Sequence, residues 1–415
     1  MNKRNRVVIT GIGVIAPNGI GLEAFWNSLL QGRSGIGPIT LFDASNLKSQ
    51  IAGEVKNFDP QEFIEPESKP KRMARHTQFA YAAAMMAMKD AGLKINACDF
   101  PSPTPVIVGV STSAMDVIER EFDNFGRLGP KGVSPITLSA LAPQAPANAI
   151  ADRIGICANA ATVSSACPSG LDAVALAASM IASGEAELAI AGGSDASITE
   201  HSLAAFIASG LTSSEANGHP ERASRPFDLL RRCGVLSEGA GIFVLENMDR
   251  ALARGARTYI ELGGFSRQRD SESGRPASGL IDSMRFALAN SAVTTSDIDF
   301  ISAYGTGDPY LDAAEVSTIK EVFHERAYSI PITSIKGVTG NPLAAGGALQ
   351  IAACALSIRD QLIPPIANYE VPDPACDLDF VAGRARRSKV DCALINVRGL
   401  GGSATSAVVK RAQDR

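Results

Sequence analysis

One cysteine stands where a thiol would be positioned to act as a nucleophile. The segment 163–170 reads Val-Ser-Ser-Ala-Cys-Pro-Ser-Gly, and we predict that it is the end of an apolar strand that turns sharply into a helix, with Cys167 at the turn. Pro168 suits the first position of a helix, because it has no N–H to leave unpaired and its φ is already helical. The positive end of the helix dipole would favour the thiolate form of the cysteine. The alternative is a small buried cysteine that fills a tight turn, and the strand–turn–helix context favours the nucleophile.

Two later glycine-rich turns are predicted to face that thiol. The first, Ala-Tyr-Gly-Thr-Gly at 303–307, presents Tyr304, and the second, Lys-Gly-Val-Thr-Gly-Asn at 336–341, presents Asn341. Glycines at such positions let the backbone turn tightly and approach a ligand closely. The two side chains are therefore candidates for groups that act on whatever the thiol holds.

A third glycine-rich segment, 399–404, follows a predicted strand near the end of the chain. Its flexibility would let backbone N–H groups approach a ligand. Together with the N–H of Cys167, these groups would form an oxyanion hole. A simple glycine turn before the last strand explains the local pattern equally well.

The elements that must position these residues alternate along the chain. Short apolar, β-branched runs alternate with alanine-rich helical stretches, which indicates an α/β layered fold with sheets covered on both faces. The turns at 167, 304 and 341 suggest two similar halves that meet near residues 250–258. The predicted strands are 7–9, 105–110, 161–165, 188–191, 241–245, 259–264, 300–303, 393–397 and 407–410, and the predicted helices are 77–91, 171–183, 200–207, 279–291, 313–322 and 345–358.

The composition indicates a globular protein without a membrane span or a nucleic-acid partner. The 415 residues can bury a large core, 45% of them are hydrophobic, and the formal net charge is −4 without a long basic run. The N-terminus lacks the apolar region of a signal peptide, and no stretch of about 18 apolar residues offers a membrane span. The seven scattered cysteines form no CxxC pair, which fits a reducing compartment and no metal site. We expect a cytoplasmic protein without a metal or nucleotide cofactor.

Two other features are expected to carry no chemistry. Gly-Ile-Gly-Val-Ile-Ala at 11–16 superficially resembles a dinucleotide fingerprint, but Pro-Asn-Gly interrupts the expected helix and no acidic ribose partner follows at the expected spacing. The four histidines lie outside the glycine-rich turns. We expect His76, His219 and His324 at the surface, and leave His201 open.

Taken together, these segments resemble the β-ketoacyl-acyl-carrier-protein synthases, the elongating condensing enzymes of fatty acid and polyketide synthesis. The resemblance runs from Val-Val-Ile-Thr-Gly-Ile-Gly at 7–13, through Ser-Arg-Pro-Phe-Asp at 224–228 and Gly-Val-Leu-Ser-Glu-Gly-Ala-Gly at 234–241, to the loop at 399–402. It implies the thiolase fold, a five-layered αβαβα arrangement of two related halves, here expected at 1–253 and 254–415. It also implies a homodimer, or a heterodimer with a ketosynthase, and an acyl carrier protein as partner.

The resemblance assigns a role to each residue of the site. Cys167 matches the nucleophile that takes the acyl chain, whereas Tyr304 and Asn341 replace the two histidines that decarboxylate malonyl-carrier protein and stabilise the enolate. The turn that the family usually writes His-Gly-Thr-Ser-Thr keeps its first threonine and loses its second to an aspartate. The remaining matches are Thr306 and Asp308 in that turn, the family's lysine at Lys336, its supporting acid at Glu315, and Leu400 in place of the gating phenylalanine between Gly399 and Gly401.

These departures keep the acyl-transfer features, which are the cysteine, the helix N-terminus and the glycine loop. They alter the residues for malonyl decarboxylation, at Tyr304, Asp308 and Asn341. The leading hypothesis is a chain-length-factor-like subunit that shapes the acyl pocket beside a complete synthase, although typical chain-length factors lose the cysteine that this chain keeps. The second is a stand-alone synthase or acyltransferase that loads Cys167 and uses Asn341 and Tyr304 in place of the histidine pair. The third is a purely structural or acyl-binding protein with an inert cysteine.

Pocket and docking residues complete the expectations. Phe206, Leu400 and Met115 are candidates for the acyl pocket, although apolar side chains there would equally suit an ordinary core. A basic cluster at the start of a predicted helix resembles the family's carrier-protein docking surface, and acidic carrier proteins would be steered by it. A solvated helix face would look the same. The cluster consists of Lys69, Lys71, Arg72 and Arg75.

Overall fold

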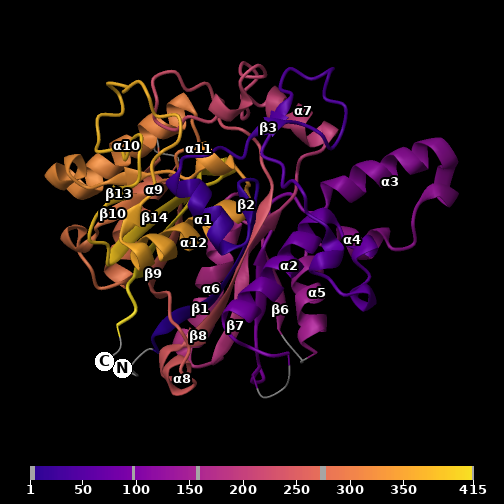
Figure 1. Ribbon diagram of the computed structural model, residues 1–415, viewed down its shortest axis with the longest axis horizontal. Coiled ribbons are helices and arrows are strands. Elements are labelled where there is room, and N and C mark those ends of the chain that lie inside the picture. Colours follow the sequence, from indigo (N-terminus) through magenta and orange to yellow (C-terminus); the bar gives the residue numbers. More distant parts are fainter. Residues whose placement is uncertain (1–4, 96–98, 156–158, 272–276, 414–415) are drawn as a thin grey trace.

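The computed structural model describes residues 5–95, 99–155, 159–271 and 277–413 (Figure 1). Its strands are β1 (Val7–Ala16), β2 (Gly19–Ile20), β3 (Gly37–Pro38), β4 (Ile51–Ala52), β5 (Val106–Gly109), β6 (Ala160–Val163), β7 (Leu188–Asp195), β8 (Gly239–Asn247), β9 (Ile260–Arg269), β10 (Phe300–Ser302), β11 (Ile332–Thr333), β12 (Leu362–Ile363), β13 (Arg386–Arg387), β14 (Cys392–Arg398) and β15 (Ser403–Lys410). Its α-helices are α1 (Leu22–Leu30), α2 (Arg75–Asp90), α3 (Met115–Leu128), α4 (Thr137–Leu141), α5 (Ala145–Ile154), α6 (Ser169–Ser183), α7 (Glu200–Ala208), α8 (Met248–Ala253), α9 (Ser278–Asn290), α10 (Pro309–Phe323), α11 (Lys336–Thr339) and α12 (Ala344–Asp360).

The sheet repeats one topology twice. The first half has the strand order β1-β8-β7-β5-β6, and the second has the order β9-β15-β14-β10-β11. In each half the first two pairings are antiparallel and the last two are parallel. A short antiparallel pairing of β1 with β9 joins the halves. The two related halves expected from the sequence are therefore present, while the boundary after residue 253 stays a prediction.

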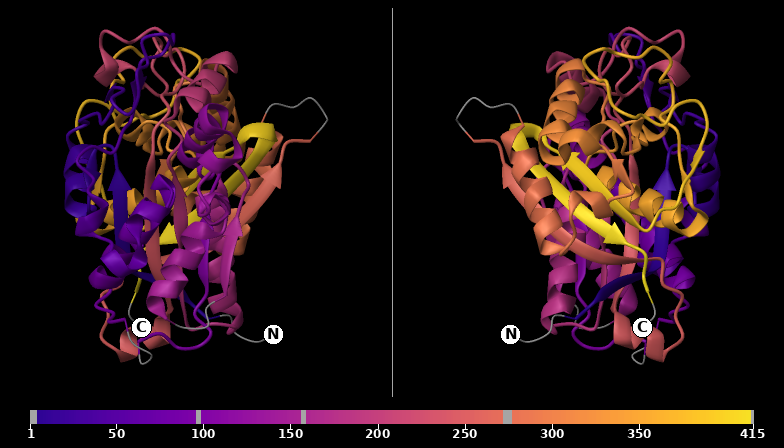
Figure 2. Two further views of the ribbon diagram at one scale, coloured as in Figure 1. Left: turned by 90° about the vertical axis from the view of Figure 1, so that its right-hand side faces the viewer. Right: turned by 90° about the vertical axis from the view of Figure 1, so that its left-hand side faces the viewer.

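Helices cover both faces of the two half-sheets. Helix α6 packs on β7 and β5, α12 packs on β7 and β14, and the two helices contact each other in the middle of the molecule. Helices α2 and α5 cover the outer face of the first half, and α9 and α10 cover the second half (Figures 1 and 2). This succession of layers is the expected five-layered αβαβα thiolase fold.

The glycines of β1 serve packing. A Cβ atom at Gly13 would lie 1.8 Å from the carbonyl oxygen of Ala83, and one at Gly11 would lie 2.1 Å from that of Ala87. Both carbonyls belong to α2, so the glycines let this helix lie directly on the strand. Segment 11–16 is strand throughout and does not turn into a helix, as the segment of a dinucleotide fingerprint would.

The central helices approach each other at their N-terminal ends. A Cβ atom at Gly170 would lie 2.3 Å from the carbonyl oxygen of Ala344, and one at Gly193 would lie 2.5 Å from the same oxygen. Backbone therefore meets backbone where α6 and α12 begin. The residues that precede these helices, Cys167 and Asn341 among them, are brought to one place.

Helix α3 projects from the rest of the molecule (Figure 1). Several of its apolar side chains are exposed. Phe122 is 76% exposed, and a leucine of the neighbouring α4, Leu138, is 83% exposed. The other large apolar side chains exposed on α3 are Ile118, Phe125 and Leu128. This set, together with Leu138, is called the α3 face below.

Candidate active site

The cysteine turn is held in an uncommon backbone conformation. Ala166, the residue before Cys167, has φ of +64°, in the left-handed region that non-glycine residues seldom adopt. The Ser169 hydroxyl donates to the Ala166 carbonyl at 2.5 Å and accepts from the Ser165 N–H at 2.8 Å. Pro168 directly precedes the first residue of α6, and its carbonyl accepts from Asp172 at 2.9 Å. The expected strand–turn–helix is therefore present, with Cys167 at the helix N-terminus.

The tyrosine turn is fixed by a buried carboxylate. Glu315, on α10, accepts from the N–H of Tyr304 at 2.9 Å and from that of Gly305 at 3.0 Å. A Cβ atom at Gly305 would lie 2.6 Å from the Phe227 ring, so only glycine fits this point of the turn. Tyr304 itself is 6% exposed.

The asparagine turn is hydrogen-bonded to the segment 234–241 of the first half. The N–H of Asn341 donates to the Val235 carbonyl at 2.7 Å, and its carbonyl accepts from Ser237 at 3.1 Å. Gly340 has φ of +68°, and a Cβ atom there would lie 2.9 Å from the Ser237 Cβ. Glycine is therefore required directly before the asparagine.

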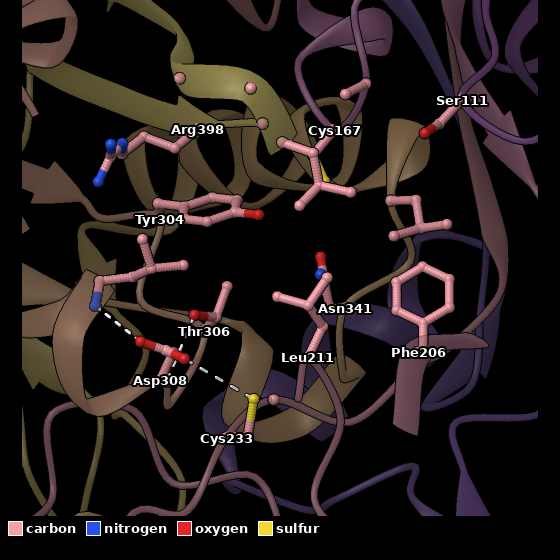
Figure 3. Close-up of a pocket in the computed structure, with 18 of the residues that line it drawn as sticks. Ser111, Cys167, Phe206, Leu211, Cys233, Tyr304, Thr306, Asp308, Asn341 and Arg398 are labelled. Atoms are coloured by element: carbon pink, nitrogen blue, oxygen red, sulfur yellow. Dashed lines mark hydrogen bonds between the residues drawn. The ribbon is translucent and has the colours of Figure 1, made fainter. Parts of the chain in front are cut away.

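The three turns line one cavity of about 410 Å³. Figure 3 shows the Tyr304 hydroxyl pointing into the space between Cys167 and Asn341. Phe206, Leu211 and Leu343 supply an apolar wall, and Ser111 and Thr112 lie at another edge. The remaining lining residues are Ala166, Cys233, Gly234, Asp270, Thr306, Asp308, Tyr310, Leu311, Arg398, Gly399, Leu400, Gly401 and Gly402.

The thiol and the phenol influence each other. Burial raises the pKa of Cys167, and a hydrogen bond from the Tyr304 hydroxyl and the positive charge of Lys336 partly offset that rise. Burial and the neighbouring thiol raise the pKa of Tyr304 well above its ordinary value, so this side chain is a neutral hydrogen-bond donor at physiological pH. Tyr304 can therefore support a thiolate or a thioester oxygen by donation, and it cannot serve as an anionic base there.

Lys336 lies directly behind the tyrosine. Its Nζ donates to the Tyr304 carbonyl at 2.8 Å and lies 4.2 Å from the centre of the aromatic ring. Burial lowers the pKa of this lysine to about 8, although Cys167 and Glu315 oppose the shift. Burial raises the pKa of Glu315, whose carboxylate also accepts from Asn396 at 3.3 Å. Lysine and acid therefore position the tyrosine turn.

The last glycine-rich loop packs against the cysteine turn. A Cβ atom at Gly399 would lie 2.8 Å from Pro168 and 3.1 Å from Ala166. The Ser403 hydroxyl donates to the Ser165 carbonyl at 3.2 Å. Leu400 is 62% exposed and does not seal the cavity as a buried gate would. The loop lies where its backbone can complete an oxyanion hole with Cys167.

The aspartate of the tyrosine turn serves the backbone. Asp308 caps α10, with Oδ1 accepting from the N–H of Tyr310 at 2.9 Å and of Leu311 at 2.8 Å. Its Oδ2 lies 3.9 Å from the sulfur of Cys233, and Thr306 lines the cavity beside it. The negative charge at the cavity wall is therefore partly used by a helix N-terminus.

Two predicted sites lie differently from the expectation. Met115 begins α3 and is not among the residues that line the cavity, whereas Phe206 is. In the basic cluster, Lys69, Lys71 and Arg72 are exposed. Arg75 instead pairs bidentately with the buried Glu238, with Nε at 2.8 Å and Nη2 at 2.6 Å. The charge of Arg75 is neutralised by this buried carboxylate, which directly precedes β8 and lies far from Arg75 in the sequence.

The histidine expectation was wrong at one position. His76 is completely buried at the start of α2, and burial lowers its pKa to about 4. Neither ring nitrogen has a hydrogen-bond partner within the described parts of the chain. The charged neighbours in the sequence predicted a surface residue, but His76 lies on the face of α2 that packs inward. His219 and His324 are exposed, as expected, and His201, which the sequence left open, is exposed as well.

Two functional candidates were missed from the sequence. Arg398 lines the cavity at the end of β14, and Asp195 joins both halves of the molecule by accepting from the Ala344 N–H at 2.8 Å and from Thr112 at 3.1 Å. Burial raises the pKa of Asp195 to about 6. The signal for Arg398 was present, since a charged residue ends an otherwise apolar strand. The partners of Asp195 are too distant in sequence to be inferred.

Comparison with known proteins assigns the class. The model of the beta-ketoacyl synthase N-terminal domain matches residues 4–251, and that of the C-terminal domain matches residues 261–370. The chain therefore belongs to the beta-ketoacyl synthase family. It is 37% identical to 3-oxoacyl-[acyl-carrier-protein] synthase 2 of Coxiella burnetii, over 100% of both chains.

Solved structures agree with this class. The ishigamide ketosynthase/chain length factor superposes with a TM-score of 0.91 at 32% identity, covering 99% of this chain and 100% of that one. A type II polyketide synthase acyl-carrier protein in complex with its ketosynthase bound to the hexaketide gives a TM-score of 0.90 at 30% identity, with the same coverage. Among the helices of the described residues, none is long and apolar enough to cross a membrane.

Proposed function

We propose that the chain is an acyl-binding ketosynthase-fold subunit that does not decarboxylate malonyl-carrier protein efficiently and serves as a chain-length-factor-like partner of a complete ketosynthase. The observation that carries this proposal is the exchange of both expected histidines, at Tyr304 and Asn341, on turns whose backbone framework is kept. Tyr304 and Asn341 stand on turns that are held by Glu315, Lys336 and the backbone of the first half. The framework is preserved, so the chemistry differs through the side chains.

The replaced pair is expected to be a poor catalyst of decarboxylation. Loss of one donor to a developing oxyanion typically lowers a rate by about 10²–10³, so two independent losses would lower it by about 10⁴–10⁶. Asn341 can still donate a neutral hydrogen bond, and Tyr304 donates toward the thiol. The Asp308 carboxylate at the cavity wall opposes a malonyl carboxylate there.

The exposed apolar residues of the α3 face support the proposal that this chain binds a partner chain. Its exposed phenylalanines and leucines form an apolar surface of the kind that marks a protein–protein contact. We propose that a ketosynthase-fold subunit, either a complete ketosynthase or a second copy, covers it. An acyl carrier protein is the proposed second partner, docking at the exposed Lys69, Lys71 and Arg72 by charge attraction.

The retained cysteine supports a second candidate function. Cys167 lines the cavity, and although burial raises its pKa, the hydrogen bond from Tyr304 and the charge of Lys336 oppose that rise. The N-terminus of α6 adds a positive dipole. These features suit a stand-alone acyltransferase or synthase that accepts an acyl chain on Cys167. In the third possibility the cysteine is inert, so wild type and Cys167→Ala would behave alike with acyl thioesters.

Intact-mass spectrometry with acyl-carrier-protein thioesters separates these functions. An acyl adduct on the wild type that is absent from Cys167→Ala identifies a live nucleophile. Malonyl-carrier protein is then added, and release of carbon dioxide is measured for the chain alone and with a complete ketosynthase. Release only in the presence of that partner supports the proposed function, whereas efficient release and condensation by the chain alone refutes it. A Phe122→Asp variant that stays folded but loses the partner tests the α3 face.

A further inference from the structure

A buried carboxylate connects the two halves of the molecule beside the cavity. Asp195 ends β7 and is completely buried. From the first half its oxygens accept from the Thr112 N–H at 3.1 Å and from the Ser111 N–H at 3.2 Å, and from the second half they accept from the Ala344 N–H at 2.8 Å. Ser111 and Thr112 line the cavity, at the edge where Figure 3 shows Ser111. The same side chain therefore holds one cavity wall and the beginning of α12.

The residue before Ala344 is held in a strained backbone conformation. Leu343 has φ of +47° and ψ of −116°, which are close to the angles of the first central position of a type II′ turn, where glycine is usual. The hydrogen bond of that turn is present, from the Ala345 N–H to the Pro342 carbonyl at 3.0 Å. A leucine persists at such angles only where its surroundings fix it. The Leu343 side chain is buried and lines the cavity, so the strain lies in the apolar wall itself.

Asp195 supplies this constraint. The peptide that joins Leu343 to Ala344 carries the N–H that donates to the carboxylate. Rotation of Leu343 toward common backbone angles would turn this N–H away and break the hydrogen bond. The carbonyl on the other side of Ala344 is packed so closely against the first half that a Cβ atom at Gly193 would lie 2.5 Å from its oxygen. The peptide units on both sides of Ala344 are therefore held.

We propose that Asp195 is a positioning residue that holds Leu343 at a fixed distance from the Ser111–Thr112 segment and thereby sets the preference of the cavity for acyl chain length. This role rests on the proposed function, in which the cavity binds acyl thioesters. A carboxylate suits it, because one oxygen accepts from Thr112 while the other accepts from Ala344. The competing explanation is that Asp195 only satisfies the N-terminus of α12, without effect on the acyl group that the cavity accepts.

Binding of two thioesters of different length tests the role. Butyryl and octanoyl thioesters of N-acetylcysteamine differ by four methylenes, and each methylene that a protein buries multiplies the affinity by about 4-fold. Their dissociation constants are measured by calorimetry on the full-length Cys167→Ala parent, which cannot form an adduct at that position. Asp195→Asn is nearly isosteric and turns one acceptor oxygen into a donor, so it cannot serve both halves. The preference for octanoyl should then fall by about 10-fold, because contact with about two methylenes is lost.

Two further variants of the same parent separate positioning from a general loss of stability. Asp299 also accepts from two backbone N–H groups, those of Asp391 at 2.7 Å and Cys392 at 2.9 Å, but it precedes β10, at the end of the strand opposite the tyrosine turn. Asp299→Asn should therefore leave the preference within about 2-fold of the parent. Leu343→Gly removes the strained side chain, so Asp195→Asn added to it should alter the preference by less than about 2-fold.

Hydrogen exchange gives a readout that does not depend on acyl binding. Asp195→Asn should accelerate exchange in peptides that cover 111–117 and 341–350, and Asp299→Asn should leave both unchanged. Exchange that stays slow in either segment of Asp195→Asn would show that Asp195 does not position the wall.

The outcomes separate this role from the proposed function. A preference for octanoyl that Asp195→Asn leaves unchanged, or an equal loss in the Leu343→Gly background, overturns the proposal and leaves only the support of α12. Equal affinities of the parent for both thioesters refute a chain-length preference and leave acyl binding intact. If neither thioester binds to the parent, the proposed acyl-binding function fails, and hydrogen exchange still decides whether Asp195 positions the wall.

Discussion

Removal of the Tyr304 hydroxyl should slow the reaction of Cys167 with an electrophile at neutral pH. The hydroxyl points between Cys167 and Asn341, and its hydrogen bond lowers the pKa of the thiol against the effect of burial. Tyr304→Phe removes that donor and preserves the ring, whose face lies over Lys336. The pKa of Cys167 therefore rises, and a smaller fraction is thiolate at neutral pH.

The size of the effect follows from the strength of the lost hydrogen bond. A hydrogen bond to a charged group contributes about 1.5–3 kcal/mol, so the thiolate population below the pKa falls by about 10-fold to 100-fold. A more basic thiolate is more nucleophilic, with a Brønsted coefficient of about 0.4–0.5, which recovers nearly half of that loss on a logarithmic scale. The expected net rate near neutral pH is about 3-fold to 10-fold slower. Above the pKa of both thiols the variant should react faster, so the two pH profiles should cross.

The assay is alkylation by iodoacetamide, followed by mass spectrometry of the peptide that contains Cys167. Peptide resolution is needed because the chain has other cysteines. Tyr310→Phe is the matched control, since Tyr310 lines the same cavity but is 63% exposed. Parallel pH profiles for wild type and Tyr304→Phe, or equal effects of both variants, would refute the argument that the Tyr304 hydroxyl acts on the thiol.

Three further predictions test the surroundings of the site. Arg75→Glu should destabilise the fold by about 3–5 kcal/mol in urea denaturation, because it leaves the buried Glu238 unpaired. Lys71→Glu, at an exposed position, should lower carrier-protein affinity and change stability by no more than about 0.5 kcal/mol. Equal stabilities of the two variants would contradict the separation of a buried Arg75 from an exposed docking lysine. Glu315→Ala should lower stability by about 1–3 kcal/mol for each of the two buried N–H groups left without an acceptor, and an unchanged urea midpoint would refute it. Lys336 has a folded-state pKa of about 8, below its ordinary 10.5, so between these pH values the unfolded chain binds more protons than the folded chain. The free energy of unfolding should therefore rise with pH between about 8 and 10.5. Urea titrations of Lys336→Met should lack that rise, and an unchanged dependence of the unfolding free energy on pH would contradict the prediction.

The layered fold could be predicted from the sequence because its strands are buried and regular. The expected helix at 345–358 is α12, Ala344–Asp360, and the expected strand at 393–397 lies within β14. Helix α3 was missed. Its apolar residues Ile118, Phe122, Phe125 and Leu128 recur at the three- and four-residue spacing of an amphipathic helix, so the signal for this helix was present in the sequence. That these side chains stay exposed in the single chain required the structure.

The candidate site was predictable where the signal is local. Neighbouring residues in the sequence are enough to predict a cysteine at a helix N-terminus and glycines in tight turns. The structure confirms that Tyr304 and Asn341 line one cavity with Cys167. Pairings across the chain are different. The neutralisation of Arg75 by Glu238 joins residues 163 positions apart, which no local pattern specifies. Whether a charge is free for docking therefore required the structure.

The repeated topology places the acyl-accepting cysteine and the altered side chains in different halves of the chain. Cys167 precedes the central helix of the first half, whereas Tyr304, Asp308, Asn341 and Arg398 all come from the second. A duplicated fold of this kind can change how it treats one substrate through substitutions confined to one copy, and the acyl-accepting turn is untouched. Where α6 and α12 begin, the close backbone approach leaves no room for a side chain at Gly170 or Gly193, so the site between the halves depends on these two glycines.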